Sequence, residues 1–215
     1  MIEFIRKQIG RLYERSISLL VLNLVYVFLW GFTSGKVEQY GYGILFSLIF
    51  IFAVRAVKKN NRWLFLFSAF SISVFWLSFF LDMKLIMLSS YILSIIFFSI
   101  TMVLLVLRLA GAKEITAVEF LEGINLYLLM GITGSLLFSI IYLHVPDAFS
   151  SANPLKTPYD LIYFSFVTLT SLGYGDIVPI THGAKSMAIF LSFSGQIYIA
   201  MIVSMMVGKY LNSKN

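Results

Sequence analysis

Long stretches almost free of charge limit what this sequence can fold into. Six of them are apolar and close to the roughly 20 residues that a helix needs to cross a bilayer. They cover residues 16–35, 39–57, 63–81, 85–107, 123–143 and 186–208. A water-soluble core has no room for six such segments, so the sequence predicts an all-α integral membrane protein with six transmembrane helices.

Composition excludes several other classes of protein. Hydrophobic residues make up 60% of the chain and charged residues only 12%, whereas soluble domains have about 25% charged residues. There is no cysteine, so the chain has neither a disulfide framework nor a thiolate metal site, and His144 and His182 lack metal-ligand spacing. No acid, base, nucleophile or metal cluster faces a shared site, so we expect no enzymatic activity and no cofactor.

Membrane topology explains the net charge of +6 better than nucleic-acid binding does, because the basic residues lie between the apolar stretches. With a cytoplasmic N-terminus, twelve of the 16 lysines and arginines fall in cytoplasmic segments: Arg6, Lys7, Arg11, Arg15, Arg55, Lys58, Lys59, Arg62, Arg108, Lys113, Lys209 and Lys214. We therefore predict a multi-pass protein of the plasma or inner membrane with both termini in the cytoplasm. Residues 1–15 alternate basic and apolar side chains, which predicts an amphipathic helix on anionic lipid.

A short polar segment, residues 168–179, lies between the last two apolar stretches. Stripping water from a cation requires a ring of oxygens, and successive carbonyls face one axis only when the backbone visits conformations that glycine tolerates. Gly173 and Gly175 supply that freedom, and Tyr174 between them would point away from the axis. The Ser171 hydroxyl would add an innermost oxygen, and the Asp176 carboxylate would attract cations at the outer mouth. The alternative is an ordinary glycine-rich extracellular turn.

The order Gly173-Tyr174-Gly175-Asp176, preceded by hydroxyl residues, resembles the selectivity filter of potassium channels, in which carbonyls of four strands replace the hydration shell of the ion. The resemblance covers about residues 123–208, is to the pore domain of prokaryotic potassium channels, and implies an outer helix, a re-entrant pore helix, the filter and an inner helix. It implies K+ as the permeant ion, coordinated along Ser171, Leu172, Gly173, Tyr174 and Gly175. One strand makes a quarter of a ring, so a homotetramer follows. Ser171-Leu172 departs from the usual Thr-Val.

A pore helix is expected from Pro158 to about Thr170, with Thr157 as its N-cap. The resemblance places Tyr163 and Phe164 in an aromatic collar behind the filter, together with Thr168 and Thr170 as filter support. Simple apolar packing is an equal alternative for Phe164. Phe164 also lacks an indole donor for Asp176, and Val167 stands where some small bacterial channels have a glutamate that pairs with this aspartate.

Glycines in the last two stretches have two interpretations. In the resembled channels a glycine at the position of Gly195 lets the inner helix bend during opening, whereas close helix packing is the alternative. Gln196 follows it and would face the cavity or bond a neighbouring helix. Gly123, Gly131 and Gly134 are predicted to pack against the pore helix.

The first four stretches lack a voltage sensor. Steep voltage gating needs several charges in the field, and residues 85–107 contain no arginine. We therefore expect little or no voltage dependence, and residues 16–110 would form a scaffold, a lipid-facing collar or a regulator's site. Residues 111–122 are expected as a cytoplasmic linker and 209–215 as a short tail, with no soluble regulatory domain in the chain.

The leading hypothesis is a passive, potassium-selective tetrameric channel. A weakly selective monovalent cation channel is a close alternative. A coupled transporter is disfavoured because the chain has one pore loop and no mid-span ionisable residue. A non-conducting membrane scaffold or sensor is the remaining class.

Overall fold

The computed structural model describes residues 2–29, 36–57, 62–112, 116–152, 154–155 and 158–212, and it is almost entirely helical. The helices are α1 (Ile2–Phe28), α2 (Lys36–Ala56), α3 (Arg62–Leu81), α4 (Lys84–Gly111), α5 (Ala117–His144), α6 (Tyr159–Leu169) and α7 (His182–Asn212). A one-turn 3-10 helix η2 (Pro146–Ala148) and two short strands, β1 (Phe149–Ser151) and β2 (Ile177–Pro179), complete the described elements. The prediction of an all-α fold is therefore confirmed.

Four of the helices are long and apolar enough to cross a membrane, within the part of the chain that the structure describes. These are Arg62–Leu81, Lys84–Gly111, Ala117–His144 and His182–Met205. They coincide with four of the six predicted segments. The remaining two predicted segments, 16–35 and 39–57, correspond to α1 and α2, and their crossing of the membrane stays a prediction.

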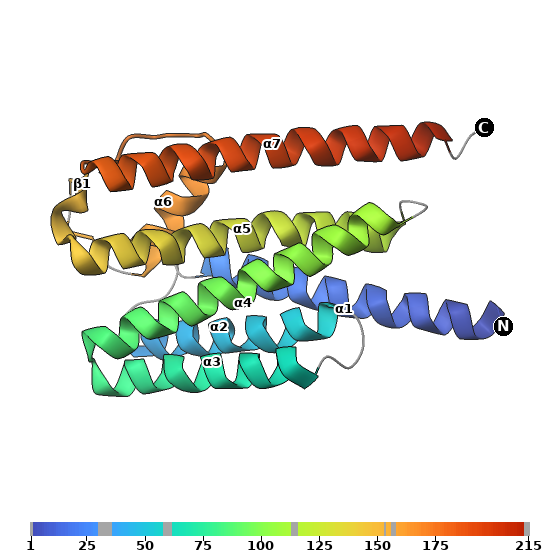
Figure 1. Ribbon diagram of the computed structural model, residues 1–215, viewed down its shortest axis with the longest axis horizontal. Helices are drawn as coiled ribbons and strands as arrows, with labels where there is room; N and C mark the ends of the chain where they lie inside the picture. The colour runs from blue at the N-terminus through green and yellow to red at the C-terminus, as the bar shows by residue number, and fades with distance from the viewer. Residues whose placement is uncertain are drawn as a thin grey trace.

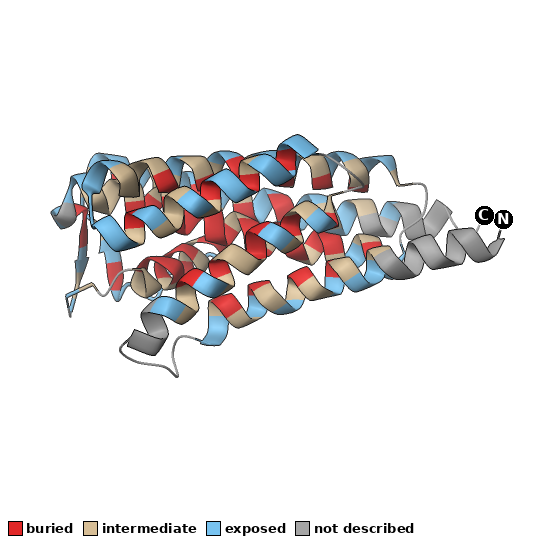
Figure 2. Cartoon of the chain, turned by 90° about the horizontal axis from the view of Figure 1, so that it is seen from below, coloured by how far each residue is buried: buried red, intermediate tan, exposed pale blue. Residues whose placement is uncertain are grey.

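The helices form two layers around α5 (Figure 1). Helices α1 and α4 pack against α5, and α2 and α3 lie beyond them, while α7 lies on the other side of α5 and the short α6 lies between α5 and α7. Buried residues concentrate where the helices face one another, and exposed residues line the outer surfaces (Figure 2). The first turn of α1 and the last turn of α7 lie at the same end of the molecule.

Aromatic packing dominates the core of the first four helices. Phe46 and Phe50 of α2 are fully buried against Phe97 and Phe98 of α4, with the Phe50 and Phe97 ring centroids 4.4 Å apart. Stacked and edge-on rings at such distances are stabilised beyond the burial of their surface. These helices are thus held to one another mainly by apolar contacts.

A polar cluster joins α1, α4 and α5 within this largely apolar structure. Arg108 Nη1 of α4 lies 2.9 Å from Glu122 Oε1 of α5, and the Glu122 side chain is only 1% exposed. Asn23 Nδ2 donates to Asn125 Oδ1 over 3.1 Å, and Asn125 Nδ2 donates to the carbonyl of Ser16 over 2.8 Å. This cluster was not predicted from the sequence, because no ionisable residue was expected in the interior of the bundle.

The segment expected as a linker, residues 111–122, is helical from residue 117 onward, and its role as a cytoplasmic linker stays a prediction. Residues 117–122 form the first turns of α5, because Thr116 caps the helix and Glu119 completes a capping box with it. Similarly, α1 is one continuous helix across the boundary expected at residue 15. The side chains of residues 1–11 lie outside the described part, so the expected amphipathic face stays a prediction.

Candidate functional site

The short helix α6 packs on α5 and leads into residues 171–175, which are the candidate ion-binding strand. It runs from Tyr159 to Leu169 with Pro158 and Thr170 as its end residues, as the sequence predicts, while Thr157 lies outside the described residues. Ser165 Oγ donates to the Gly131 carbonyl of α5 over 2.6 Å. A side chain at Gly131 would collide with Phe166, and one at Gly134 would meet Ser165 and Leu191.

The predicted packing role of these glycines is therefore correct for Gly131 and Gly134, which are necessary for the close approach of α6 to α5. Gly123 differs, because its nearest neighbours are Tyr198 and Ile202 of α7 and not α6. The Tyr198 hydroxyl also donates to the Gly123 carbonyl over 2.5 Å. Gly123 thus belongs to the contact between α5 and α7.

The chain turns sharply at the end of α6 and becomes extended. The Val167 carbonyl accepts from the backbone N–H of Leu172 at 3.0 Å and of Gly173 at 3.4 Å, and the Thr168 carbonyl accepts from Ser171 N–H. From there the backbone alternates: φ is +58° at Ser171, +58° at Gly173 and +80° at Gly175, whereas Leu172 and Tyr174 avoid positive φ. Positive φ is uncommon outside glycine, so the alternation is a specific backbone property.

The carbonyl oxygens of this strand are available to a ligand. Among the described residues, no backbone hydrogen bond ends on the carbonyls of residues 171–175. Residues 171–175 are exposed in the single chain, so water or an ion can satisfy these oxygens. The alternating backbone and the unpaired oxygens together give the strand the properties expected of a dehydrating cation site.

Two large side chains of the strand are exposed in the single chain. Leu172 is 59% exposed and Tyr174 is 67% exposed. Both side chains therefore leave apolar surface open along this strand in the single chain.

The inner end of the strand is hydrogen-bonded to α7 through Ser171. Gln196 Nε2 donates to Ser171 Oγ over 3.0 Å, and Ser171 Oγ lies 2.9 Å from Ser192 Oγ. From the sequence, Gln196 was expected to face the cavity or bond a neighbouring helix, and Ser192 was not predicted as a site residue. Polar residues spaced four apart in an apolar helix were the available signal.

The outer end of the strand is fastened to α6 and to a small sheet. The Tyr163 hydroxyl donates to Asp176 Oδ2 over 2.6 Å, and this hydrogen bond holds the pKa of the exposed Asp176 carboxyl below its ordinary value. β2 then pairs antiparallel with β1, with Ser150 opposite Val178. The exposed carboxylate is therefore kept charged and fixed in place.

Phe164 packs in the apolar interior behind the strand. Its ring lies 4.7 Å from that of Phe138 and 5.4 Å from that of Phe149, between α5 and β1. Of the two threonines expected to support the filter, Thr168 accepts from the Ser171 N–H through its carbonyl, and Thr170 Oγ1 donates to the Phe166 carbonyl over 2.7 Å. Their support of a filter stays a prediction. The geometry gives Phe164 a direct packing function.

Gly195 lies where α7 crosses the end of α6. A side chain here would run into the carbonyl of Leu169, which is backbone and cannot swing aside. The hydroxyl of Tyr127 on α5 reaches the same carbonyl at 3.4 Å. The close-packing interpretation of Gly195 thus has a direct structural basis, and bending at this residue stays a prediction.

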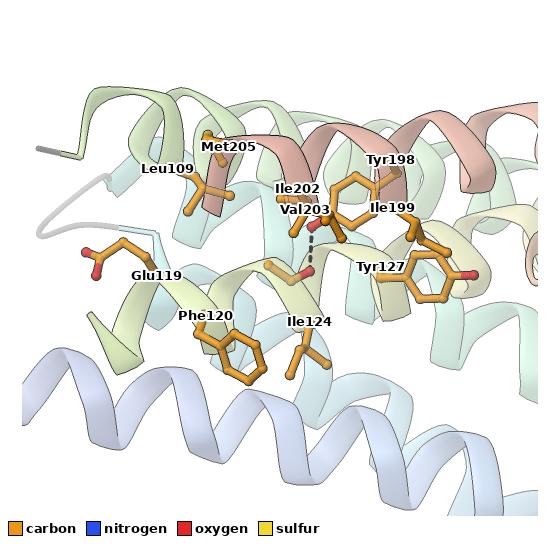
Figure 3. Close-up of a pocket in the computed structure, with 11 residues that line it drawn as sticks. Leu109, Glu119, Phe120, Ile124, Tyr127, Tyr198, Ile199, Ile202, Val203 and Met205 are labelled. Carbon is orange, nitrogen blue, oxygen red and sulfur yellow. Dashed lines mark hydrogen bonds between the residues drawn. The ribbon is translucent and has the colours of Figure 1, made fainter. Parts of the chain in front are cut away.

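An apolar cavity of about 190 Å³ lies between α5 and α7 near the end at which both termini lie. Figure 3 shows Tyr198, Ile202 and Ile124 among its lining side chains, with the Tyr198 hydrogen bond to Gly123 beside it. No group of three or more histidine, aspartate or glutamate side chains that could hold a metal ion occurs in the described residues. The candidate ion site rests instead on the backbone geometry of residues 171–175.

Comparison with known proteins bears on the same region. Residues 126–211 match a protein family described as "Ion channel". Over 87 residues the chain is 38% identical to "Two pore potassium channel c" of Oryza sativa subsp. japonica, covering 40% of this chain and 18% of that protein. Over 84 residues it is 30% identical to "A-type voltage-gated potassium channel KCND3" of Homo sapiens, covering 39% and 13%.

A third relative, "Two-pore potassium channel 4" of Arabidopsis thaliana, is 38% identical over 53 residues, covering 25% of this chain and 19% of that protein. The chain thus spans less than a fifth of the length of each of these relatives. No solved structure matches. The similarity covers α6, the candidate strand and the two helices that flank them, and this region is therefore similar to ion channels.

Proposed function

We propose that the protein is a potassium-selective channel that conducts K+ passively through a ring of four strands, one from each copy of the chain. The observation that carries the proposal is the alternating positive φ at residues 171, 173 and 175, which leaves the strand's carbonyls without partners in a region similar to ion channels. Carbonyl oxygens at contact distance replace the hydration shell of a cation.

A homotetramer is the assembly that the proposal requires. One strand offers only one side of an ion site, and its Leu172 and Tyr174 side chains are uncovered in the single chain. Helix α7 supports the same idea, because the buried residues among its described side chains form a stripe that includes Ala184, Leu191 and Tyr198, while Ile189, Phe190 and Phe193 are exposed. Neighbouring copies and lipid would cover these apolar faces.

Weak voltage dependence is the second part of the proposal. Within α4 the basic residues are Lys84 and Arg108, one at each end of the helix. Arg108 is paired with Glu122 at 2.9 Å, so its charge is compensated and fixed by a second helix. A sensor needs several charges that move through the field, at about 2.3 kcal/mol per charge per 100 mV. The placement of the α1 and α7 ends on one side agrees with both termini being cytoplasmic.

The test is flux through the purified protein in liposomes, with K+ and then Na+ as the permeant ion, alongside the mass of the purified complex. The proposal expects a tetramer with flux for K+ and little for Na+. A weakly selective cation channel is the second candidate, favoured by Ser171 and Leu172 in place of Thr-Val, and it expects equal fluxes. A monomer without flux at varied pH, voltage and lipid composition would instead favour a membrane scaffold.

A further inference from the structure

The side chain of Ser171 differs from the rest of the candidate strand, because it is bonded to two residues of α7. Gln196 Nε2 and Ser192 Oγ lie 3.0 Å and 2.9 Å from its oxygen. Ser192 and Gln196 are four positions apart, so they share one face of the helix. The close contact of Gly195 with Leu169 holds this face of α7 at the start of the strand.

The hydrogen-bonding capacity of these groups limits how the Ser171 hydroxyl is oriented. A hydroxyl has one hydrogen and two lone pairs, and an amide nitrogen only donates. Gln196 therefore occupies one lone pair of the Ser171 oxygen. When Ser171 gives its own hydrogen to Ser192, the second lone pair is left free and no hydrogen faces it. An oxygen in that state is a ligand for a cation.

We propose that Gln196 and Ser192 are positioning residues that orient the Ser171 hydroxyl and so set the affinity of the innermost cation site. The proposal rests on the proposed function. Neither residue contacts the ion in this arrangement, because both act through the Ser171 oxygen. Movement of α7 would change the geometry of these two bonds, so the affinity of the site depends on the position of this helix.

A second serine of α7 provides a matched control. Ser194 Oγ donates to the Phe190 carbonyl of its own helix over 2.7 Å, and no described bond joins it to the strand. Ser192→Ala and Ser194→Ala thus remove the same hydroxyl from the same helix, and only the first removes a bond to Ser171. Gln196→Met removes the donor and keeps a similar side-chain length.

The experiment measures K+ flux through these variants in liposomes and the Ba2+ concentration that halves it. Ba2+ is the probe because it is close to K+ in size and carries twice the charge, so it occupies an oxygen-lined site and blocks it. We expect Gln196→Met and Ser192→Ala each to raise that concentration about threefold to tenfold, the effect of losing one hydrogen bond. The double variant should exceed either single variant only slightly, because the bonds share one oxygen. Ser194→Ala should match the wild type.

Three results would overturn the inference in distinguishable ways. Normal K+ flux with equal Ba2+ sensitivity in all variants would remove the positioning role and leave the proposed function intact. Lower unfolding temperatures in Gln196→Met and Ser192→Ala with unchanged Ba2+ sensitivity would assign the bonds to stability alone. A wild type with neither K+ flux nor Ba2+-dependent thermal stabilisation would refute both proposals. If the wild type is stabilised without conducting, the same variants are compared by the Ba2+ concentration that gives half the stabilisation.

Discussion

The phenolic hydroxyl of Tyr163 and the carboxylate of Asp176 are joined by a hydrogen bond of 2.6 Å. The bond spans thirteen positions of sequence and links α6 to the chain just beyond the glycine strand. Phe164 has no donor for Asp176, and Val167 has no carboxyl group, so the sequence suggested no partner for this aspartate. Tyr163 supplies the partner, and it holds the outer end of the strand on the helix that supports its inner end.

Replacing Tyr163 by phenylalanine should shift the loss of K+ flux in acid to a higher external pH, because Asp176 loses its hydrogen bond. The hydrogen bond lowers the pKa of Asp176 below its ordinary value of 3.8. The stability that the charged carboxylate contributes is therefore fully present above pH 3.8, and it is lost as pH falls through the lower pKa of the folded protein. Without the hydroxyl the carboxylate protonates nearer pH 3.8. We therefore expect K+ flux of Tyr163→Phe to decline at a higher external pH than that of the wild type.

The measurement is flux in liposomes between external pH 3 and 6, a range that contains the ordinary aspartate pKa of about 3.9. Tyr159→Phe is the matched control, since it makes the same change in the same helix, and no described hydrogen bond joins Tyr159 to Asp176. Superimposable pH profiles for Tyr163→Phe and the wild type would show that this bond does not control the charge of the mouth.

The sequence predicted those features that depend on local composition. Uninterrupted apolar runs predicted α3, α4, α5 and α7, because a helix in lipid must be apolar along its whole length. The extent of α6 followed from the proline at its start and the glycines beyond it. Gly131 and Gly134 were assigned correctly as packing residues, since small residues mark close helix contacts in membranes.

The polar cluster and the bonds of Ser171, which sequence reasoning missed, join residues that are distant in the sequence. Glu122 lies beside Arg108 only because α4 and α5 run alongside each other, and no local pattern pairs them. The bonds of Ser171 to α7 span 21 and 25 positions. Polar residues such as Asn23 and Asn125 inside apolar stretches were the available signal, because a polar group in that setting requires a partner.

Substituting alanine for Gly195 should displace α7 from α6. The added carbon would run into the Leu169 backbone carbonyl, and overpacking of this kind costs about 1–3 kcal/mol. Thermal unfolding in detergent should therefore show a clear loss of stability. Gly208→Ala in the same helix is the control, because its site is open and the added carbon meets nothing within 4 Å. Unchanged stability with altered channel opening would favour the hinge interpretation of Gly195.

Breaking the pair between Arg108 and Glu122 should destabilise the contact of the first four helices with α5. Arg108→Leu leaves the buried carboxylate of Glu122 unpaired, and the loss of one partner of a buried pair costs about 3–5 kcal/mol. The double variant with Glu122→Leu should lose clearly less than the sum of the two single losses.

A double-mutant cycle on thermal unfolding measures this coupling. Arg62→Leu serves as the control, because it removes an arginine whose side chain is exposed at the start of α3. Additive losses in the double variant would show that Arg108 and Glu122 contribute independently of each other.

The most direct test of a carbonyl-lined ion site compares alanine substitutions at two glycines, each of which has room for the added Cβ atom. Neither Gly173 nor Gly183 has an atom within 4 Å of an added carbon, but only Gly173 has positive φ, at +58°. Alanine at Gly173 therefore strains the backbone by about 1–2 kcal/mol without any collision in the chain. Liposome flux should show K+ conduction abolished in Gly173→Ala and retained in Gly183→Ala. Equal K+ flux through both variants would contradict the assignment of residues 171–175 as the ion-conducting strand.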